Sequence, residues 1–318
     1  MTVRARRFWA LIACLAFAYS AWQVWGFVRQ YRADEIIAWL AALPPANVLA
    51  SAAFAFASYL TLTGYDYIAV RYAGGRLAYT KIAIASFVSV GIGYPLGPAP
   101  LGTGVLRYFY YTRLGLGLEA FAKLALLIMV TAVMGKFSFT GLVLLYDPAT
   151  AARLFRIDDA IVIAAAVISL AGVALYVVLC LLWRRRLRIG AWYFGLPNVE
   201  IALAQVALGS INYFCIAACL HQLMSAAEPI SYPAVASAYM AANFAVLLTH
   251  VPGGWGVMEF VLFSILPSLD VIGAVIAFRA IYYLAPLVLG SLLFVTVEGP
   301  AALRALISRR ATRNAETG

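Results

Sequence analysis

Residues 91–104 read Gly-Ile-Gly-Tyr-Pro-Leu-Gly-Pro-Ala-Pro-Leu-Gly-Thr-Gly, and residues 250–256 read His-Val-Pro-Gly-Gly-Trp-Gly. The two stretches occupy matching places in the two halves of a chain of 318 residues. We expect apolar arms of about 10 to 14 residues on either side of each stretch, whereas about 20 apolar residues are needed to cross a bilayer. Such paired breaks are typical of transporters with a binding site near the middle of the membrane.

The composition around these breaks is that of a membrane protein. Hydrophobic residues make up 65% of the chain and charged residues 11%, whereas about a quarter of the residues in a soluble globular protein are charged. Few residues remain for loops, so we expect no soluble catalytic domain and no enzyme activity. The hydropathy pattern predicts full spans near residues 8–28, 46–70, 120–146, 160–183, 200–223 and 271–297.

The basic residues indicate how these spans are oriented. The net charge is +10, but the Lys and Arg residues gather at the ends of spans instead of forming a nucleic-acid-binding patch. Loops on the cytoplasmic side of a membrane are enriched in Lys and Arg. We therefore expect both termini in the cytoplasm and no nucleic acid partner. The basic clusters that support this are at residues 4–7, 71–81, 184–188 and 304–313.

This orientation constrains the two broken regions. Residues 82–116 must begin and end on the cytoplasmic side, and residues 232–266 must begin and end on the outer side. Each region is either two short crossings or a re-entrant hairpin, and arms of about 15–20 Å fit a hairpin better than a hydrocarbon core of about 30 Å. The second half then repeats the first half with inverted topology.

The sequence therefore predicts an all-α, polytopic membrane helix bundle with about six full spans and two re-entrant helical hairpins. We expect one integral-membrane domain over residues 1–318. Its inverted-repeat halves would cover residues 1–150 and 155–300, followed by a basic cytoplasmic tail at 301–318.

The tip of the second hairpin offers a first candidate site. Irregular backbone inside a membrane must line a cavity or be buried in protein. Pro252, Gly253, Gly254 and Gly256 precede a helix that we expect to begin near Val257, and free N–H groups at a helix start bind anions. The alternative is that these glycines only permit a tight turn against a neighbouring helix.

Ionisable side chains inside spans supply further candidates, since each costs about 2.5–3.5 kcal/mol at a helix centre on insertion scales. The deepest are Arg107, Lys136, Glu259 and Arg279. Their excess of positive charge suits a lipid phosphate. We expect Arg107, Glu259 and Arg279 to converge beside the Gly253–Gly254 turn. Glu259 would either form a structural bridge to one of the two arginines or contact the ligand. The predicted lipid-binding residues are Arg107, Lys136, Pro252, Gly253, Gly254, Gly256, Glu259 and Arg279.

The other polar residues are predicted to have structural roles. We expect charged side chains nearer the cytoplasmic interface to extend to the interface; they are Asp66, Arg113, Glu119 and Lys123. Uncharged polar residues within spans should form interhelical hydrogen bonds; they are Gln205, Asn212 and Asn243. Cys215 and Cys219 share a helix face without a nearby histidine, which favours packing over metal binding. The chain has no Walker loop, HExxH or GxSxG motif, and we expect no metal and no cofactor.

Two passages resemble the lysylphosphatidylglycerol synthase transmembrane-region family of bacterial inner-membrane proteins. Residues 98–116, which run from Pro-Ala-Pro-Leu-Gly-Thr-Gly through Arg-Tyr to Arg-Leu-Gly-Leu, resemble its Gly-rich stretch and the Arg-Tyr segment after it. Residues 250–259 resemble its more specific Pro-Gly-Gly-x-Gly-x-x-Glu motif. The resemblance covers approximately residues 10–300, although Pro98 and Pro100 stand where that family has Gly-rich or polar residues.

In two-part members of that family, the membrane module translocates aminoacylated phosphatidylglycerol, which a separate cytoplasmic domain makes from aminoacyl-tRNA. The sequence has no counterpart of that domain, so the resemblance implies lipid handling without synthase activity. It implies a flippase-like protein of the bacterial inner membrane whose partner is an anionic or aminoacylated phospholipid. One alternative is a lipid-binding scaffold for a lipid-synthesis enzyme or glycosyltransferase. Another is a transferase with a lipid-linked donor, which would need a deep acid or base besides Glu259.

Overall fold

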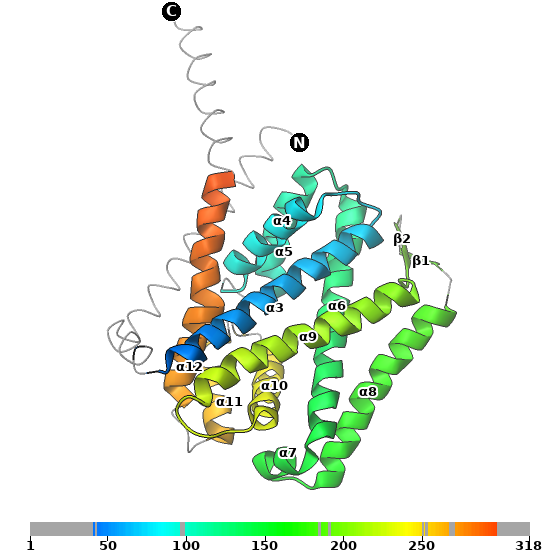
Figure 1. Cartoon of the computed structure of the whole chain (residues 1–318). Coiled ribbons are helices and arrows are strands. Elements are labelled where there is room, and N and C mark those ends of the chain that lie inside the picture. Colours follow the sequence, from blue (N-terminus) through cyan, green and yellow to red (C-terminus); the bar gives the residue numbers. More distant parts are fainter. Residues whose placement is uncertain are drawn as a thin grey trace, which may run out of the picture.

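The chain folds as a helical bundle with one short β-hairpin (Figure 1). The computed structural model describes residues 41, 43–95, 99–183, 186–189, 192–249, 251, 254–266 and 271–297. The helices are α3 (Pro45–Tyr72), α4 (Tyr79–Gly93), α5 (Ala99–Arg113), α6 (Leu118–Tyr146), α7 (Pro148–Phe155), α8 (Asp159–Leu182), α9 (Val199–Met224), α10 (Tyr232–Thr249), α11 (Val257–Ile265) and α12 (Val271–Arg279). Helix α12 continues through a π-helical segment, η2 (Ala280–Leu284). The candidate membrane span that includes this segment covers Gly273–Val297.

Six helices in the described part of the chain are long and apolar enough to cross a membrane, which confirms the predicted helical membrane bundle. Five of them coincide with expected spans, and the span expected at residues 8–28 lies outside the described residues. The sixth is α10, which has 18 residues where we predicted a shorter hairpin arm.

Both predicted breaks in helix structure are confirmed. Helix α4 ends at Gly93 before α5 begins at Ala99, and α10 ends at Thr249 before α11 begins at Val257. The arms differ from the expected lengths, because α4 and α5 have 15 residues each and α11 has nine. Helix α5 gains length by taking Pro100 into its first turn, where a missing N–H costs no hydrogen bond.

The two broken regions lie toward opposite ends of the bundle (Figure 1). Helix α4 packs against α5, and α10 packs against α11. A methyl group on Gly93 would lie 2.6 Å from the Thr103 nitrogen, so the arms of the first region approach closely. That the two regions are re-entrant hairpins, and that the halves form an inverted repeat, stay predictions.

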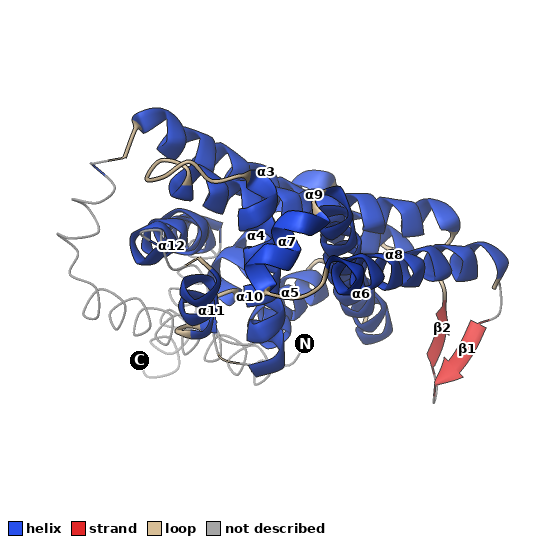
Figure 2. Cartoon of the chain, turned by 90° about the horizontal axis from the view of Figure 1, so that it is seen from below, coloured by secondary structure: helices blue, strands red, loops and turns tan. Residues whose placement is uncertain are grey.

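Helices α3 and α9 lie side by side through the bundle, and α6 crosses α9 on one side (Figures 1 and 2). The crossing is close because Gly135 and Gly209 face each other, and a side chain on Gly135 would collide with the Gly209 backbone. Small residues permit this kind of contact between membrane helices.

Two of the three predicted interhelical hydrogen bonds are confirmed. The Gln205 amide on α9 donates to Thr131 Oγ1 on α6 at 2.9 Å, and Asn212 Oδ1 accepts from Ser58 Oγ on α3 at 2.7 Å. Asn243 instead donates to the hydroxyl of Tyr239, one turn earlier on the same helix, at 3.2 Å. The prediction for Asn243 is wrong, because the hydrogen bond of its amide stays within α10.

A short antiparallel hairpin is present in this otherwise helical bundle. Strand β1 (Arg186–Ile189) pairs with β2 (Trp192–Gly195), and Ile189 opposes Trp192. Basic and apolar residues alternate along β1, and this period of two suits a strand with two different faces. The Tyr72 hydroxyl at the end of α3 donates to the Gly195 carbonyl, which ties the hairpin to the bundle.

Candidate functional site: two ion pairs and a buried lysine

The first broken region is joined to α3 by a buried ion pair. Arg107 on α5 donates from Nε to both carboxylate oxygens of Asp66, each at 3.1 Å. The Tyr111 hydroxyl donates to Asp66 Oδ2 at 3.0 Å. Asp66 is fully buried and Arg107 is 6% exposed. A carboxylate removed from water in this way needs a cation and hydrogen-bond donors to remain charged.

The burial of Asp66 corrects the sequence prediction, which placed this side chain at the cytoplasmic interface. The long stems of Lys and Arg allow their charged ends to extend to an interface, but the single methylene of Asp66 cannot. Glu119 and Lys123 do form a partly exposed pair at 2.6 Å. Sequence reasoning also missed Tyr111, although it lies one helical turn after Arg107.

The second broken region contains a matching ion pair. Arg279 on α12 donates from Nε to Glu259 Oε1 at 2.7 Å and from Nη2 to Glu259 Oε2 at 3.1 Å. The guanidinium also donates from Nη2 to the Gly254 carbonyl at 3.1 Å. Arg279 is 1% exposed. Of the two arginines that sequence reasoning considered as partners for Glu259, the structure selects Arg279.

The glycine turn before α11 positions this pair. Gly254 and Gly256 have φ angles of 64° and 77°, which side chains rarely adopt. The Gly256 N–H donates to Glu259 Oε2 at 2.9 Å, and the Gly254 N–H donates to the Val251 carbonyl at 3.0 Å. Glu259 is therefore itself the anion at the start of α11, a favourable place for negative charge. This geometry favours the turn-forming role of these two glycines; Pro252 and Gly253 lie outside the described residues.

Aromatic rings surround the guanidinium of Arg279. Its Cζ atom lies 3.9 Å from the ring centre of Trp255 and 5.8 Å from that of Tyr283. The π-helical segment that contains Tyr283 ends two residues before Pro286, and a proline disrupts the hydrogen bond to the carbonyl four residues earlier. That carbonyl belongs to Tyr282, and it accepts a hydrogen bond from the Tyr59 hydroxyl at 3.2 Å. Such substitute partners are required inside a membrane.

Two tyrosines connect the surroundings of the two ion pairs. The rings of Tyr94, at the first break, and Tyr283, next to Arg279, have centres 6.5 Å apart. Tyr94 also lies within electrostatic range of Arg107 and Asp66. Glu259 and Arg279 therefore come together beside Gly254 as predicted. Arg107 is instead bound to Asp66.

Lys136 on α6 has a different environment. It is 8% exposed, and its ammonium lies 5.2 Å from the ring centre of Phe244 and 5.9 Å from that of Tyr213. Among the described residues, no carboxylate forms an ion pair with it and no group hydrogen-bonds to it. The deep ionisable groups in the described part of the chain thus sum to +1. They are Asp66, Arg107, Lys136, Glu259 and Arg279.

His221 and Cys219 each contact a polar group of the protein. His221 contacts the Ile230 carbonyl at 3.0 Å, and Cys219 contacts Ser51 Oγ at 3.1 Å. No group of three His, Cys, Asp or Glu side chains within these ranges could hold a metal ion.

Comparison with known proteins gives two relatives that match most of the chain. The uncharacterised protein slr0712 of Synechocystis is 27% identical over 282 residues, which are 87% of each chain. The inner membrane protein YbhN of Escherichia coli is 24% identical over 291 residues, which are 88% of this chain and 85% of that protein. No protein-family model matches the chain. Together with the six candidate spans, these similarities identify a multi-pass membrane protein with bacterial relatives.

Proposed function

We propose that this protein is a flippase-like protein of the bacterial inner membrane that binds and translocates an anionic or aminoacylated phospholipid. The observation that carries the proposal is a buried arginine paired with a carboxylate at each of the two broken regions. Further support comes from the resemblance to the lysylphosphatidylglycerol synthase transmembrane-region family and from the relative named as an inner membrane protein.

Both pairs join the helix after a break to another span, which is α3, before the broken region, in the first half and α12, after the broken region, in the second. In each half, the helix after the break carries one charged partner and a neighbouring span carries the other. The signs are reversed, because α5 carries Arg107 whereas α11 carries Glu259. A short movement of α5 or α11 would separate its pair and expose one guanidinium and one carboxylate.

The chemistry of the separated pairs suits a phospholipid. A guanidinium binds phosphate through two parallel hydrogen bonds, as it binds carboxylate. The phosphate of a lipid can therefore replace Asp66 on Arg107 or Glu259 on Arg279. The released carboxylate would attract the ammonium group of an aminoacylated lipid. Lys136 adds the positive charge that favours an anionic lipid over a neutral one.

The placement of the broken regions supports alternating access. They lie toward opposite ends of the bundle (Figure 1), and rocking around a central site is the usual motion of transporters with broken helices. Glu259, Arg279 and the Gly254–Gly256 turn would contact the lipid headgroup from one end, and Arg107 from the other. Pro252 and Gly253 belong to the same proposed headgroup site.

Headgroup accessibility in proteoliposomes tests the proposal. Vesicles would contain the purified protein and phosphatidylglycerol with a fluorescent headgroup in one leaflet. We expect the protein to accelerate exchange between leaflets and the double variant Asp66→Asn/Arg107→Gln to slow it. Glu119→Gln, in the partly exposed pair, is the matched control. An unchanged leaflet distribution across phosphatidylglycerol, its lysyl ester and phosphatidylcholine would remove the proposal.

Cysteine accessibility tests the two hairpins on which alternating access depends. Single cysteines at positions 100 and 254 should be shielded, or reachable only through a cavity. Labelling of position 100 from outside, or of position 254 from the cytoplasm, at the rate of a solvent-exposed residue would show complete crossings.

A second candidate is a lipid-binding scaffold for a lipid-synthesis enzyme or glycosyltransferase. It is favoured by the fact that both buried arginines are already paired with carboxylates, an arrangement that also suits a static protein. This candidate predicts bound lipid without translocation, together with co-purification of one enzyme.

A further inference from the structure

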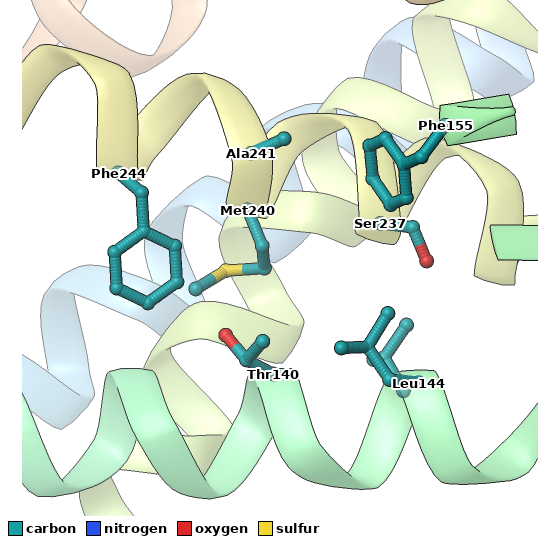
Figure 3. Close-up of a pocket in the computed structure, with 8 residues that line it drawn as sticks. Thr140, Leu144, Phe155, Ser237, Met240, Ala241 and Phe244 are labelled. Carbon is teal, nitrogen blue, oxygen red and sulfur yellow. The ribbon is translucent and has the colours of Figure 1, made fainter. Parts of the chain in front are cut away.

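A cleft lies between α6, α7 and α10, and no residue of either ion pair lines it. Its volume is about 170 Å³. Figure 3 shows Leu144 of α6, Phe155 of α7 and Met240 of α10 facing a common space. At one end the cleft is bounded by Phe244.

The size and lining of the cleft suit hydrocarbon. A buried cavity of about 150 Å³ lined by Leu, Ile and Phe stays dry and binds benzene. This cleft is similar in volume and lies between membrane helices, where acyl chains are the surrounding solvent. It can therefore take a short segment of one acyl chain.

Two polar groups, one in the cleft wall and one beside it, lack a hydrogen-bond or ion-pair partner among the described residues. Thr140 Oγ1 is buried in the cleft wall and has no hydrogen-bond partner among the described residues. Lys136 lies one helical turn before Thr140, and its ammonium rests against the ring of Phe244, which lines the cleft. A buried ammonium without a counter-ion is costly. An anionic group placed there would offset that cost.

We propose that the cleft binds an acyl chain of an anionic phospholipid whose phosphate pairs with Lys136 and accepts a hydrogen bond from Thr140. The inference rests on the proposed lipid function and deepens it, because it names a lipid site apart from the two broken regions. Apolar walls next to one unpaired cation match a molecule with a hydrocarbon chain and one negative charge. A partner helix would fill the walls and leave the ammonium unpaired.

Photolabelling tests this site. The protein is purified into nanodiscs that contain phosphatidylglycerol with a diazirine in the acyl chain, or the same probe as phosphatidylcholine. We expect the phosphatidylglycerol probe to label α6 and α10 about tenfold more than the phosphatidylcholine probe, the ratio for one charge-assisted contact. Lys136→Gln should abolish this preference, and Ala241→Phe should reduce labelling by both probes because it fills the cleft. Lys123→Gln and Leu142→Phe, on exposed parts of α6, are the matched controls.

The melting temperature provides a second measurement for the case in which a variant labels poorly. Phosphatidylglycerol should raise the melting temperature of the parent above its value in phosphatidylcholine, as a ligand of the folded state does, but not that of Lys136→Met. Equal labelling of the parent by both probes would show bulk lipid only and overturn the inference. Selective labelling without leaflet exchange would uphold the site while the proposed translocation fails. Leaflet exchange without selective labelling would support the proposed translocation and overturn the lipid site in the cleft.

Discussion

The two ion pairs differ in how each charge is supported. Asp66 is fully buried on α3, and its carboxylate depends on Arg107 together with the Tyr111 hydroxyl. Glu259 lies at the start of α11, where the Gly256 N–H also binds it. Arg279 is stacked on Trp255 and bonded to the Gly254 carbonyl. Each charge of the second pair therefore keeps a partner when the pair separates.

This difference indicates which of the two ion pairs separates more easily. Separation of the first pair would leave Asp66 buried with one neutral donor, a state that costs several kcal/mol. Separation of the second pair would leave a carboxylate at a helix N-terminus and a guanidinium on an aromatic ring, and both are favourable environments. We infer that the second pair opens more readily, whereas the first pair anchors α5 to α3 until a lipid phosphate replaces Asp66 on Arg107.

The largest expected effect is at the first pair. Arg107→Met should lower the free energy of unfolding by about 3–5 kcal/mol, because the fully buried Asp66 carboxylate loses its counter-ion. Thermal denaturation in detergent measures this loss. The double variant Asp66→Asn/Arg107→Met removes both charges and should recover most of it. If the double variant is no more stable than Arg107→Met, the single loss reflects packing and the anchor interpretation is wrong.

Glu259→Ala should have a smaller effect, about 2–3 kcal/mol, because Arg279 keeps Trp255 and the Gly254 carbonyl. Glu259→Gln keeps an acceptor for the Gly256 N–H and should lose about 1 kcal/mol. Thermal stability and lipid retention in native mass spectrometry give the two readouts, with Glu119→Ala as the control. If both variants equal the parent in thermal stability and in lipid retention, Glu259 contributes neither to stability nor to lipid binding.

Substitution of a glycine should also destabilise the protein more at the first break than at the second. A methyl group at Gly93 would lie 2.6 Å from the Thr103 backbone nitrogen, so Gly93→Ala must push the arms of the first region apart. We expect a loss of about 1–3 kcal/mol. At Gly254 the methyl would meet the Val246 side chain, which can move, so Gly254→Ala should lose about 1–2 kcal/mol through its positive φ. A larger loss at Gly254, measured by the same denaturation, would reverse the comparison.

The smallest expected effect is at the ring that supports Arg279. Trp255→Leu removes the stacked ring and should lower the free energy of unfolding by about 1 kcal/mol. In the Glu259→Gln variant the Trp255 ring provides more of the stabilisation of the guanidinium. Trp255→Leu should therefore lower the free energy of unfolding by more in that variant than in the parent. A double-mutant cycle measures this coupling. Zero coupling would show that Trp255 does not support the open pair.

The sequence by itself determined the depth and the breaks of the helices. Five expected spans and the interruptions after Gly93 and Thr249 appear in the structure, because hydropathy and Pro/Gly chemistry act within a few neighbouring residues. Lys136 and Arg279 were predicted to lie deep for the same reason, and both are buried.

Only the tertiary structure decided which groups meet. Hydropathy indicates how deep a residue lies but not which helix its side chain faces, so Asp66 was assigned to the interface instead of to Arg107. The N–H groups of Gly254 and Gly256 were expected to be free, but a turn with two positive φ angles directs them to Val251 and Glu259. Among the residues that the structure describes, Lys136 has no ion-pair partner for the same reason. Its neighbours come from α9 and α10, far away in sequence, and they present rings in place of a carboxylate.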